Sequence, residues 1–374
     1  MAEMLKPDFD PELRVFARAA SDDKGPIGMF LAAADLMAKY GLKPAVKVKV
    51  IIDSEEEINS PGISAVVAAN KALLAADGLV IHDSATHPSG RPTAIFGNRG
   101  LTALTLTVYG PRAPLHSGHF GNYAPNPALL LARLLTSMKD ENGKVLIPGY
   151  YDTTKLSEDD LKVLRSAGDD EAALLKRIGQ VDHDKVAPSY QEALQYPSLN
   201  IRGMAAASVG DKVANIIPRD ATAELDLRTT TEANGEYLAG LIAKHVKAQG
   251  FQVLSGPPTE EERAKYPKLA SIKLAPAPAE AARQPLDSPI RRWTEKALEQ
   301  SFAAAGNLPS KPVLIRAMDA TVPTYEISHP LGLPFVLVPT VNADNNQHTY
   351  DENLRLGNYP TGIRTMLGLL STPY

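Results

Sequence analysis

The sequence of 374 residues contains no cysteine. Disulfide bonds, thiolate zinc sites and cysteine nucleophiles are therefore excluded, and any metal ion must be held by Asp, Glu or His. No sign of charge dominates, since 43 acidic residues stand against 39 Lys and Arg residues. A net charge of −4 without a basic run argues against a nucleic-acid or anionic-membrane surface. We expect a small molecule or a peptide as the partner, with no nucleic acid and no membrane.

Long apolar runs are also missing. No uncharged stretch reaches the roughly 18 to 20 residues that a membrane span needs, and residues 1–11 carry too many charges for a secretory signal. We therefore expect a cytoplasmic protein. The chain also lacks the G-x-S-x-G turn of serine hydrolases and the G-x-x-x-x-G-K-[ST] loop of phosphate-binding enzymes.

The first hundred residues are expected to alternate between strands and helices. Residues 24–40 place apolar side chains at helical spacing and stop at Gly41, which predicts a helix. Residues 46–52 are β-branched and short, which predicts a strand, and residues 58–76 return to helical spacing. Residues 79–81 form a further apolar strand, so the pattern favours an α/β domain.

The pattern changes to antiparallel strands after residue 100. Residues 101–109 and 221–229 alternate as half-buried strands, and residues 125–138 and 234–249 are expected to be helices. We expect an α+β layer of two sheet-forming segments and two helices, in which residues 101–109 offer a strand edge.

A Pro- and Ala-rich stretch at residues 274–285 is interpreted as a linker. Beyond it, a long helix from Ser288 and short apolar strands at residues 313–315 and 334–338 restore the first pattern. The predicted organisation is therefore an α/β domain made of residues 1–98 and 286–374. An α+β domain over residues 99–285 is inserted within it.

Acidic residues follow the predicted strands of the first domain. In an open parallel sheet the carboxyl ends of strands meet at one edge, so Asp22, the stretch at residues 53–57 and Asp83 should gather there. Divalent cations need anionic ligands, and a spare carboxylate can take a proton from water, so Glu56 and Glu57 could divide these roles. Simpler interpretations are a helix cap at the Asp22-Asp23 pair, a solvated helix start at the glutamates and a turn at Asp83.

Several motifs occur in a fixed order along the chain. They are Ser21-Asp22-Asp23-Lys24-Gly25, the acidic stretch at residues 53–60, Asp83, His116-Ser117-Gly118 ahead of Asn126-Pro127, and His348 followed by an acid four residues later. In this order they resemble the M20 family of metallopeptidases, in the long-lid branch with carnosinase-like dipeptidases. The resemblance spans nearly the whole chain. It implies a zinc-peptidase-like catalytic domain with a mixed, mostly parallel sheet, and an inserted lid domain through which homodimers form.

The resemblance also implies roles for the acidic residues. Asp22 would touch two metal ions, Glu57 and His348 would complete the first site, and Asp83 would be a ligand at the second. Glu56 would be the general base that takes a proton from a metal-activated water. Zinc is the expected ion, with manganese or cobalt as alternatives, at one or two ions per protomer.

Further residues match the family's substrate contacts. His116, reaching the active site of the partner subunit, would stabilise the oxyanion, and Arg228 would grip a substrate carboxylate. Asn215 and Thr321 match other substrate-contact positions. The implied activity is hydrolysis of an amide bond in a dipeptide or small peptide, with an N-acyl amino acid as the alternative substrate.

One motif of the family has no counterpart here. Relatives carry an H-x-D motif upstream of S-D-D-K-G whose histidine binds the second metal, whereas no histidine precedes His82. By strand alternation His82 should point away from Asp83 and be structural. We expect the chain to lack that N-terminal segment and its first metal site to bind more tightly than its second. A non-catalytic dimeric family member with a degenerate metal site is the alternative.

Overall fold

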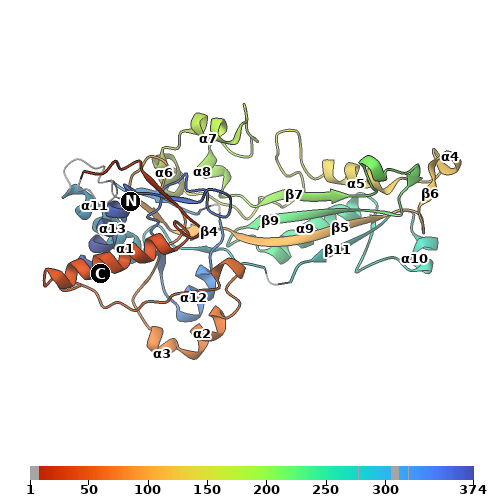
Figure 1. Cartoon of the computed structure of the whole chain (residues 1–374). Coiled ribbons are helices and arrows are strands. Elements are labelled where there is room, and N and C mark those ends of the chain that lie inside the picture. The colour runs from red at the N-terminus through yellow and green to blue at the C-terminus, as the bar shows by residue number, and fades with distance from the viewer. Residues whose placement is uncertain (1–7, 277, 305–310, 319) are drawn as a thin grey trace. The chain divides into compact units, whose positions relative to one another are not determined.

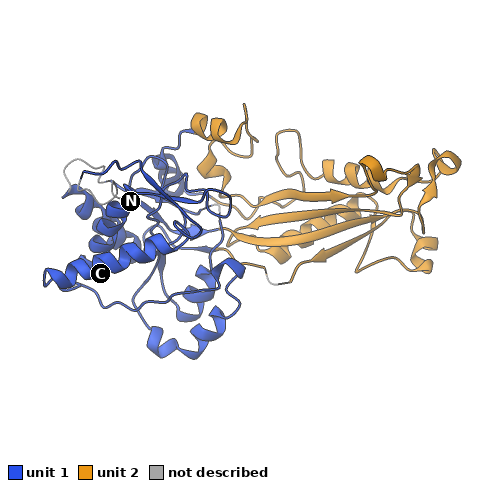
Figure 2. Ribbon diagram, in the orientation of Figure 1, with its two compact units in different colours: residues 1–98, 156–170, 282–374 blue, residues 99–155, 171–281 orange. Residues whose placement is uncertain are grey.

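The computed structural model describes residues 8–276, 278–304, 311–318 and 320–374, and the chain divides into two compact units (Figure 2). Unit 1 comprises Met1–Asn98, Leu156–Asp170 and Ala282–Tyr374, and unit 2 comprises Arg99–Lys155 and Glu171–Ala281. The chain thus leaves unit 1 after Asn98, passes through it again at residues 156–170 and returns to it at Ala282. No described helix combines the length and the apolar character of a membrane-crossing segment.

Unit 1 is built on a mixed four-stranded sheet. Its strands are β2 (Leu79–Ile81), β3 (Thr93–Ile95), β13 (Val313–Ile315) and β14 (Phe335–Leu337), in the order β13-β3-β14-β2. Two of the pairings are parallel, and β14 with β3 is antiparallel. Strands β3 and β14 are buried along their whole length, as expected for strands covered on both faces. The predicted α/β architecture with a mostly parallel sheet is confirmed.

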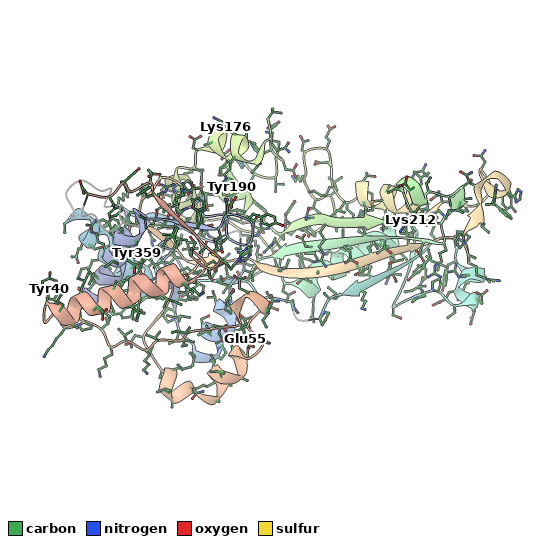
Figure 3. The ribbon with its side chains drawn as sticks, viewed as in Figure 1. Tyr40, Glu55, Lys176, Tyr190, Lys212 and Tyr359 are labelled. Carbon is green, nitrogen blue, oxygen red and sulfur yellow. The ribbon has the colours of Figure 1, made fainter. Side chains whose placement is uncertain are left out.

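Three helices of unit 1 pack together (Figure 1): α1 (Lys24–Lys39), α11 (Pro289–Ala303) and α13 (Asn358–Ser371). Met29, Ala33 and Met37 recur every four residues on α1 and are buried against α13. Tyr359 of α13, labelled in Figure 3, lies against Gly28 of α1, where an added Cβ would be 3.2 Å from its hydroxyl. The predicted helices at residues 24–40 and from Ser288 onwards are confirmed.

Two expectations for the segment between α1 and β2 are wrong. Residues 46–52 form no strand and pair with no described strand, and Val50 and Ile52 are exposed. β-branched residues favour strands only where a neighbouring strand supplies hydrogen bonds and packing. The single helix expected over residues 58–76 is instead a 3₁₀ turn η2 (Glu56–Ile58) followed by α2 (Ile63–Ala69) and α3 (Lys71–Leu74).

A strand from the N-terminal region and a strand from the C-terminal region form a small sheet. Strand β1 (Arg14–Phe16) pairs antiparallel with β15 (Asn353–Arg355), so the turn that follows β1 lies beside the loop that precedes β15. This pairing places Asp22 and His348 in the same region. The remaining elements of unit 1 are β4 (Gly97–Asn98), α6 (Glu158–Ala167), β12 (Ala282–Arg283) and α12 (Thr324–Leu331).

Unit 2 contains a five-stranded sheet in the order β10-β11-β5-β9-β7. The strands are β5 (Gly100–Tyr109), β7 (Ser198–Ala205), β9 (Asp220–Thr229), β10 (Gln252–Leu254) and β11 (Leu269–Leu274). Alternate residues of β5 and β9 are buried against α5 (Pro127–Thr136) and α9 (Gly235–Ala248). The other elements are β6 (Leu115–His116), α4 (Ser117–Phe120), α7 (Glu171–Ile178), α8 (Tyr190–Ala193), η3 (Gly210–Lys212), β8 (Ile216–Ile217) and α10 (Glu260–Lys265).

The two strands and two helices predicted for this region are present, and β5 pairs antiparallel with β9 as expected. However, the sheet has three further strands, and β5 lies between β11 and β9. The prediction that residues 101–109 offer a strand edge is therefore wrong, and the edges of the sheet are β10 and β7. Likewise, the expected linker at residues 274–285 contains β12, which pairs with β4.

Candidate metal centre

Asp22, Glu57 and His348 converge in unit 1. One ligand atom of each lies within 4.8 Å of the others. His348 Nε2 is 2.8 Å from Asp22 Oδ2 and 3.0 Å from Glu57 Oε2. Asp22 precedes α1, Glu57 lies in η2, and His348 lies in the loop between β14 and β15. The fold thus assembles these side chains from three distant segments.

The donor set fits a divalent cation. A tetrahedral zinc ion with bonds of about 2.0–2.1 Å would place its ligand atoms roughly 3.3 Å apart, close to the separations around His348 Nε2. Two carboxylates and an imidazole are ligands that zinc, manganese and cobalt accept. The side chains of Glu57 and His348 are 55% and 62% exposed, so an ion can reach them from solvent.

The segment that carries Asp22 is fixed by a buried carboxylate. Glu352 Oε1 accepts the backbone N–H groups of Ser21 and Asp22, each at 3.1 Å, and Oε2 accepts that of Ala19 at 3.0 Å. Burial alone would raise the pKa of Glu352, but these N–H groups and the nearby Arg18 hold the pKa below its usual value. Glu352 is therefore ionised at neutral pH.

The helix-cap interpretation of the Asp-Asp pair is not supported. Asp23 occupies the N-cap position of α1, yet its side chain makes no capping hydrogen bond. The peptide bond between Asp22 and Asp23 is cis. The carboxyl of Asp23 instead lies among Asp22, Glu56 and Asp83, whose charges it senses.

The loop that carries His348 has a left-handed backbone at several positions. His348 has φ 63°, and Asn346 and Asp351 have φ 53° and 60°. Asn and Asp tolerate this region better than most residues. Gln347 contributes directly, because its Nε2 donates to Asp22 Oδ2 at 3.1 Å.

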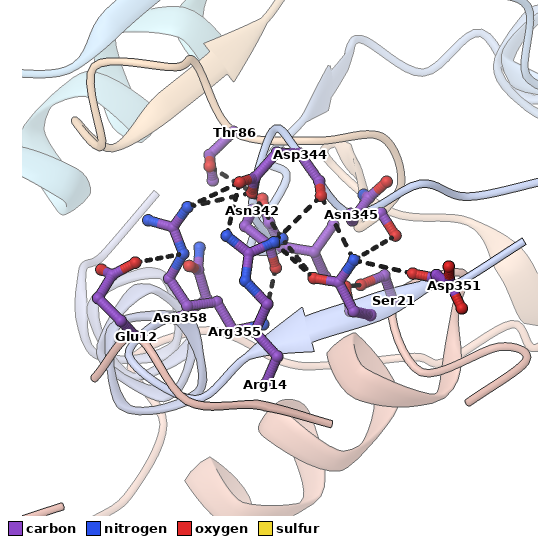
Figure 4. A network of polar contacts seen from close by, with 12 residues as sticks. Glu12, Arg14, Ser21, Thr86, Asn342, Asp344, Asn345, Asp351, Arg355 and Asn358 are labelled. Carbon is purple, nitrogen blue, oxygen red and sulfur yellow. Dashed lines mark hydrogen bonds and ion pairs between the residues drawn. The ribbon is translucent and has the colours of Figure 1, made fainter. Parts of the chain in front are cut away.

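A polar network holds the same loop against β1 (Figure 4). Asp344 accepts from Arg14 at 2.6 Å and from Arg355 at 3.0 Å, and Asn342 Nδ2 donates to it at 2.9 Å. Asn353 Nδ2 donates to the carbonyl of Asp351 at 3.0 Å. These contacts fix the base of the loop from which His348 projects.

Negative charge is concentrated around the three converging residues. Burial, with the charges of Asp83, Asp22 and Glu56, raises the pKa of Asp23 to about 9. Burial and the neighbouring carboxylates raise the pKa of Glu56 to about 7. Burial raises the pKa of Asp83 to about 6, although the N–H of Ser84 opposes the shift. Such a concentration of carboxyl groups favours the binding of a cation.

Asp83 lies near the cluster of Asp22, Glu57 and His348 but is not part of it. It follows β2, is largely shielded from solvent and feels the charges of Asp22 and Glu57, yet it does not belong to the three-residue cluster. Its neighbour His82 is half-buried, and its Nδ1 lies 2.9 Å from the Val338 carbonyl. That contact fits the structural role expected for His82.

The substrate-contact candidates are divided between the units. His116 and Asn215 are neighbours in unit 2, where β6 pairs with β8 and the Asn215 carbonyl accepts the N–H of Ser117 at 3.0 Å. Arg228 lies on the half-buried face of β9, also in unit 2. Thr321 lies in unit 1, between β13 and α12, and is partly buried. Within unit 2, the structure therefore brings His116 and Asn215 together.

Contacts within its own turn fix the orientation of the His116 ring. Its Nδ1 accepts the N–H of Gly118 at 3.0 Å, and the ring stacks on His119 at 4.6 Å between centroids. Because Nδ1 is an acceptor, Nε2 carries the proton in the neutral ring. The exposed Nε2–H is free to donate to a negatively charged oxygen.

Sequence analysis gave no role to Asp23, Gln347 or Glu352. Glu352 was visible only as the acid four residues after His348. Its partners are main-chain N–H groups more than 300 positions away, and no side-chain pattern marks them.

Comparison with known proteins agrees with the resemblance to M20 metallopeptidases. A sequence profile described as the M20 peptidase dimerisation domain matches residues 96–253. The chain is 25% identical over 373 residues to the Cys-Gly metallodipeptidase DUG1 of Candida albicans. This alignment covers 97% of this chain and 72% of that protein. It is 24% identical over 360 residues to human Beta-Ala-His dipeptidase, covering 94% of this chain and 67% of that protein.

Solved structures match over the same extent. An M20 family metallo-carboxypeptidase, Sso-CP2 of Sulfolobus solfataricus, gives a TM-score of 0.77 at 24% identity and covers 99% of this chain and 80% of its own. The dipeptidase Dug1p of Saccharomyces cerevisiae gives a TM-score of 0.73 at 21% identity and covers 97% of this chain and 75% of its own. These structures share the fold of this chain.

Proposed function

We propose that this chain, a member of the M20 metallopeptidases, hydrolyses the amide bond of dipeptides at a divalent-metal site formed by Asp22, Glu57 and His348. The observation that carries the proposal is the convergence of these three side chains from distant segments. Two similar proteins are named dipeptidases, one of them a metallodipeptidase. Zinc is the proposed ion because the donors are two carboxylates and one imidazole.

The adjacent glutamates have separate roles in this proposal. Glu57 lies against His348 and would hold the ion with Asp22. When bound, the ion would lower the pKa of a water molecule and polarise the substrate carbonyl. Glu56, whose pKa is about 7, would accept the proton of the attacking water and then donate it to the leaving amine. Asp83 would complete a second, weaker site with Asp22.

Unit 2 would supply the substrate contacts and the dimer. His116 Nε2–H, directed into the partner's active site, would stabilise the negative oxygen that forms when water attacks the carbonyl. Arg228 would bind a substrate carboxylate, for which a planar guanidinium suits two parallel hydrogen bonds. Asn215 and Thr321 would make further contacts. The dimerisation profile over residues 96–253 supports a homodimer through this unit.

The proposal is tested by metal content and by hydrolysis measured on the same preparations. Purified protein, depleted of metal and dialysed against zinc, should retain at least one ion, and His348→Ala should lose it. Cys-Gly and β-Ala-His are suitable first substrates, with amine release as the readout. Equal zinc content in both proteins would reject the site. Zinc binding without hydrolysis of either dipeptide would favour the non-catalytic alternative.

A further inference from the structure

Glu352 joins two of the chain segments that carry predicted metal ligands, the one with Asp22 and the one with His348. Its side chain is buried, at 3% exposed, and its two oxygens accept four hydrogen bonds. All four donors belong to residues 18–22, directly before α1. A buried carboxylate surrounded in this way is fully paired and is held in one orientation.

The hydrogen bonds fix the main chain at Asp22. Glu352 Oε1 is shared by the N–H groups of Ser21 and Asp22, and Oε2 accepts from Ala19 and from Arg18 Nη1 at 2.8 Å. Each bond sets the direction of one peptide group, so together they define the path from Ala19 to Asp22. The side chain of Asp22 leaves the main chain at the end of that path.

The same contact also anchors the His348 loop. The carbonyl of Glu352 accepts the N–H of Ala17 at 3.1 Å, and Arg18 Nη2 donates to the carbonyl of Thr349 at 3.0 Å. Thr349 follows His348 directly. These two hydrogen bonds therefore hold the loop that carries His348 against the turn before α1.

We propose that Glu352 is a positioning residue that holds Asp22 and His348 at the separation a metal ion requires. The inference rests on the metal site proposed above and assigns a role outside its ligands. Groups that orient metal ligands through hydrogen bonds typically change metal affinity by about 10- to 100-fold when they are replaced. Glu352→Gln keeps the size of the side chain but replaces one acceptor oxygen with an N–H₂ group that faces backbone donors.

Asp160 provides a matched control. It is also a shielded carboxylate of unit 1, at 14% exposed, and it pairs with Arg316, so Asp160→Asn should also lower stability. However, its side chain bonds to Ser157 and Arg316, which lie outside residues 18–22 and outside the loop that carries His348. A loss of stability alone should therefore leave metal affinity unchanged in this control.

The experiment is zinc titration of metal-depleted, full-length protein by calorimetry, with thermal unfolding measured on each variant. We expect Glu352→Gln to weaken zinc binding roughly 10- to 100-fold, and Asp160→Asn to stay within about twofold of wild type. Glu352→Asp, which keeps the charge but is one methylene shorter, should fall between them and remains informative if Glu352→Gln does not fold.

Two outcomes would overturn the inference, and they are distinguishable. If His348→Ala abolishes zinc binding while Glu352→Gln and Glu352→Asp bind as wild type does, the metal site stands and Glu352 is merely structural. If His348→Ala binds zinc as wild type does, the proposed metal site fails and the role of Glu352 fails with it.

Discussion

Glu56 and Glu57 are neighbours in the sequence but lie in different environments. Glu56 is half-buried and its pKa is raised to about 7, first by burial and then by surrounding carboxylates. Glu57 is more exposed and touches His348. A residue that exchanges protons needs a pKa near the working pH, whereas a ligand needs only to face the ion. The environments of the two residues support the roles proposed for them.

Substitution separates these roles. Glu56→Gln removes the proton acceptor but none of the three converging ligands, so zinc content should persist while dipeptide hydrolysis falls by about 10²- to 10⁴-fold. Glu57→Gln should instead lose zinc. Elemental analysis and initial rates measured on the same samples check both. Hydrolysis at the wild-type rate in Glu56→Gln would show that another group is the base.

Asp344 gives a pH-dependent contribution to stability. Burial alone would raise its pKa, but hydrogen bonds and ion pairs with Arg14, Asn342 and Arg355 lower the pKa to about 2. Because the pKa is depressed in the folded protein, the stabilisation is present above the ordinary aspartate value of 3.8 and is lost as pH falls toward 2.

The corresponding variant is Asp344→Asn. Its free energy of unfolding should be lower than that of wild type at pH 5, and the difference should shrink between pH 4 and pH 2. Asp77→Asn, at an exposed position of unit 1, should show a much smaller difference. Urea unfolding at several pH values measures this, and a difference that stays constant down to pH 2 would contradict the ion-pair account.

At the scale of single residues, the sequence shows which side chains can bind a metal ion better than it shows which residues hold them in place. A chain without cysteine leaves carboxylates and imidazole as metal donors, and the resemblance to M20 metallopeptidases selects Asp22, Glu57 and His348 among them. Their convergence in the structure agrees with that choice. The contacts of Glu352 with the backbone could not be predicted, because any residue type supplies an N–H group. They depend on the path of the main chain alone.

At the scale of elements, the sequence pattern predicts single helices and strands better than it predicts which strands pair. Helix α1 follows from periodic apolar residues and from the glycine at its end, Gly41, which are properties of the segment itself. Residues 46–52 have the composition of a strand but no described partner, and β5 alternates correctly without revealing that strands lie on both sides of it. Strand order depends on contacts between distant segments, which alternation does not encode.

Gly368 tests the packing of α13 against α11. A Cβ there would lie 2.6 Å from Ser301 Oγ and 2.9 Å from the Ala297 carbonyl, closer than real contacts allow. Gly368→Ala should therefore destabilise by about 1–3 kcal/mol through overpacking, which outweighs its helix-propensity gain of about 1 kcal/mol.

The control is Gly240→Ala in α9, where no atom lies within 4 Å of the added Cβ. It should stabilise its unit by about 0.4–1 kcal/mol. Free energies of unfolding from denaturant titrations compare the two variants. Equal stabilisation by both substitutions would mean that α11 and α13 separate without cost.

At the scale of the whole molecule, the edge of the unit 2 sheet becomes important. β7 is an edge strand of eight residues, and its Ile201 and Met204 are 44% and 52% exposed. A long edge with exposed apolar side chains is a site for pairing with another chain unless it is protected. β7 also lies within the region that matches the dimerisation profile. These features favour β7 as the strand through which two copies associate.

A double substitution tests this assignment. Ile201→Lys with Met204→Lys places two charges on the edge, so β7 should no longer join a second copy and the protein should sediment as a single chain. Val181→Lys, at a fully exposed apolar residue of the same unit, should leave the dimer intact. Sedimentation velocity at micromolar concentration distinguishes the two states. If the double variant still dimerises, the interface lies elsewhere than at β7. If the wild-type protein is a monomer, the homodimer is rejected, and the proposed role of His116 in the partner's active site is rejected with it.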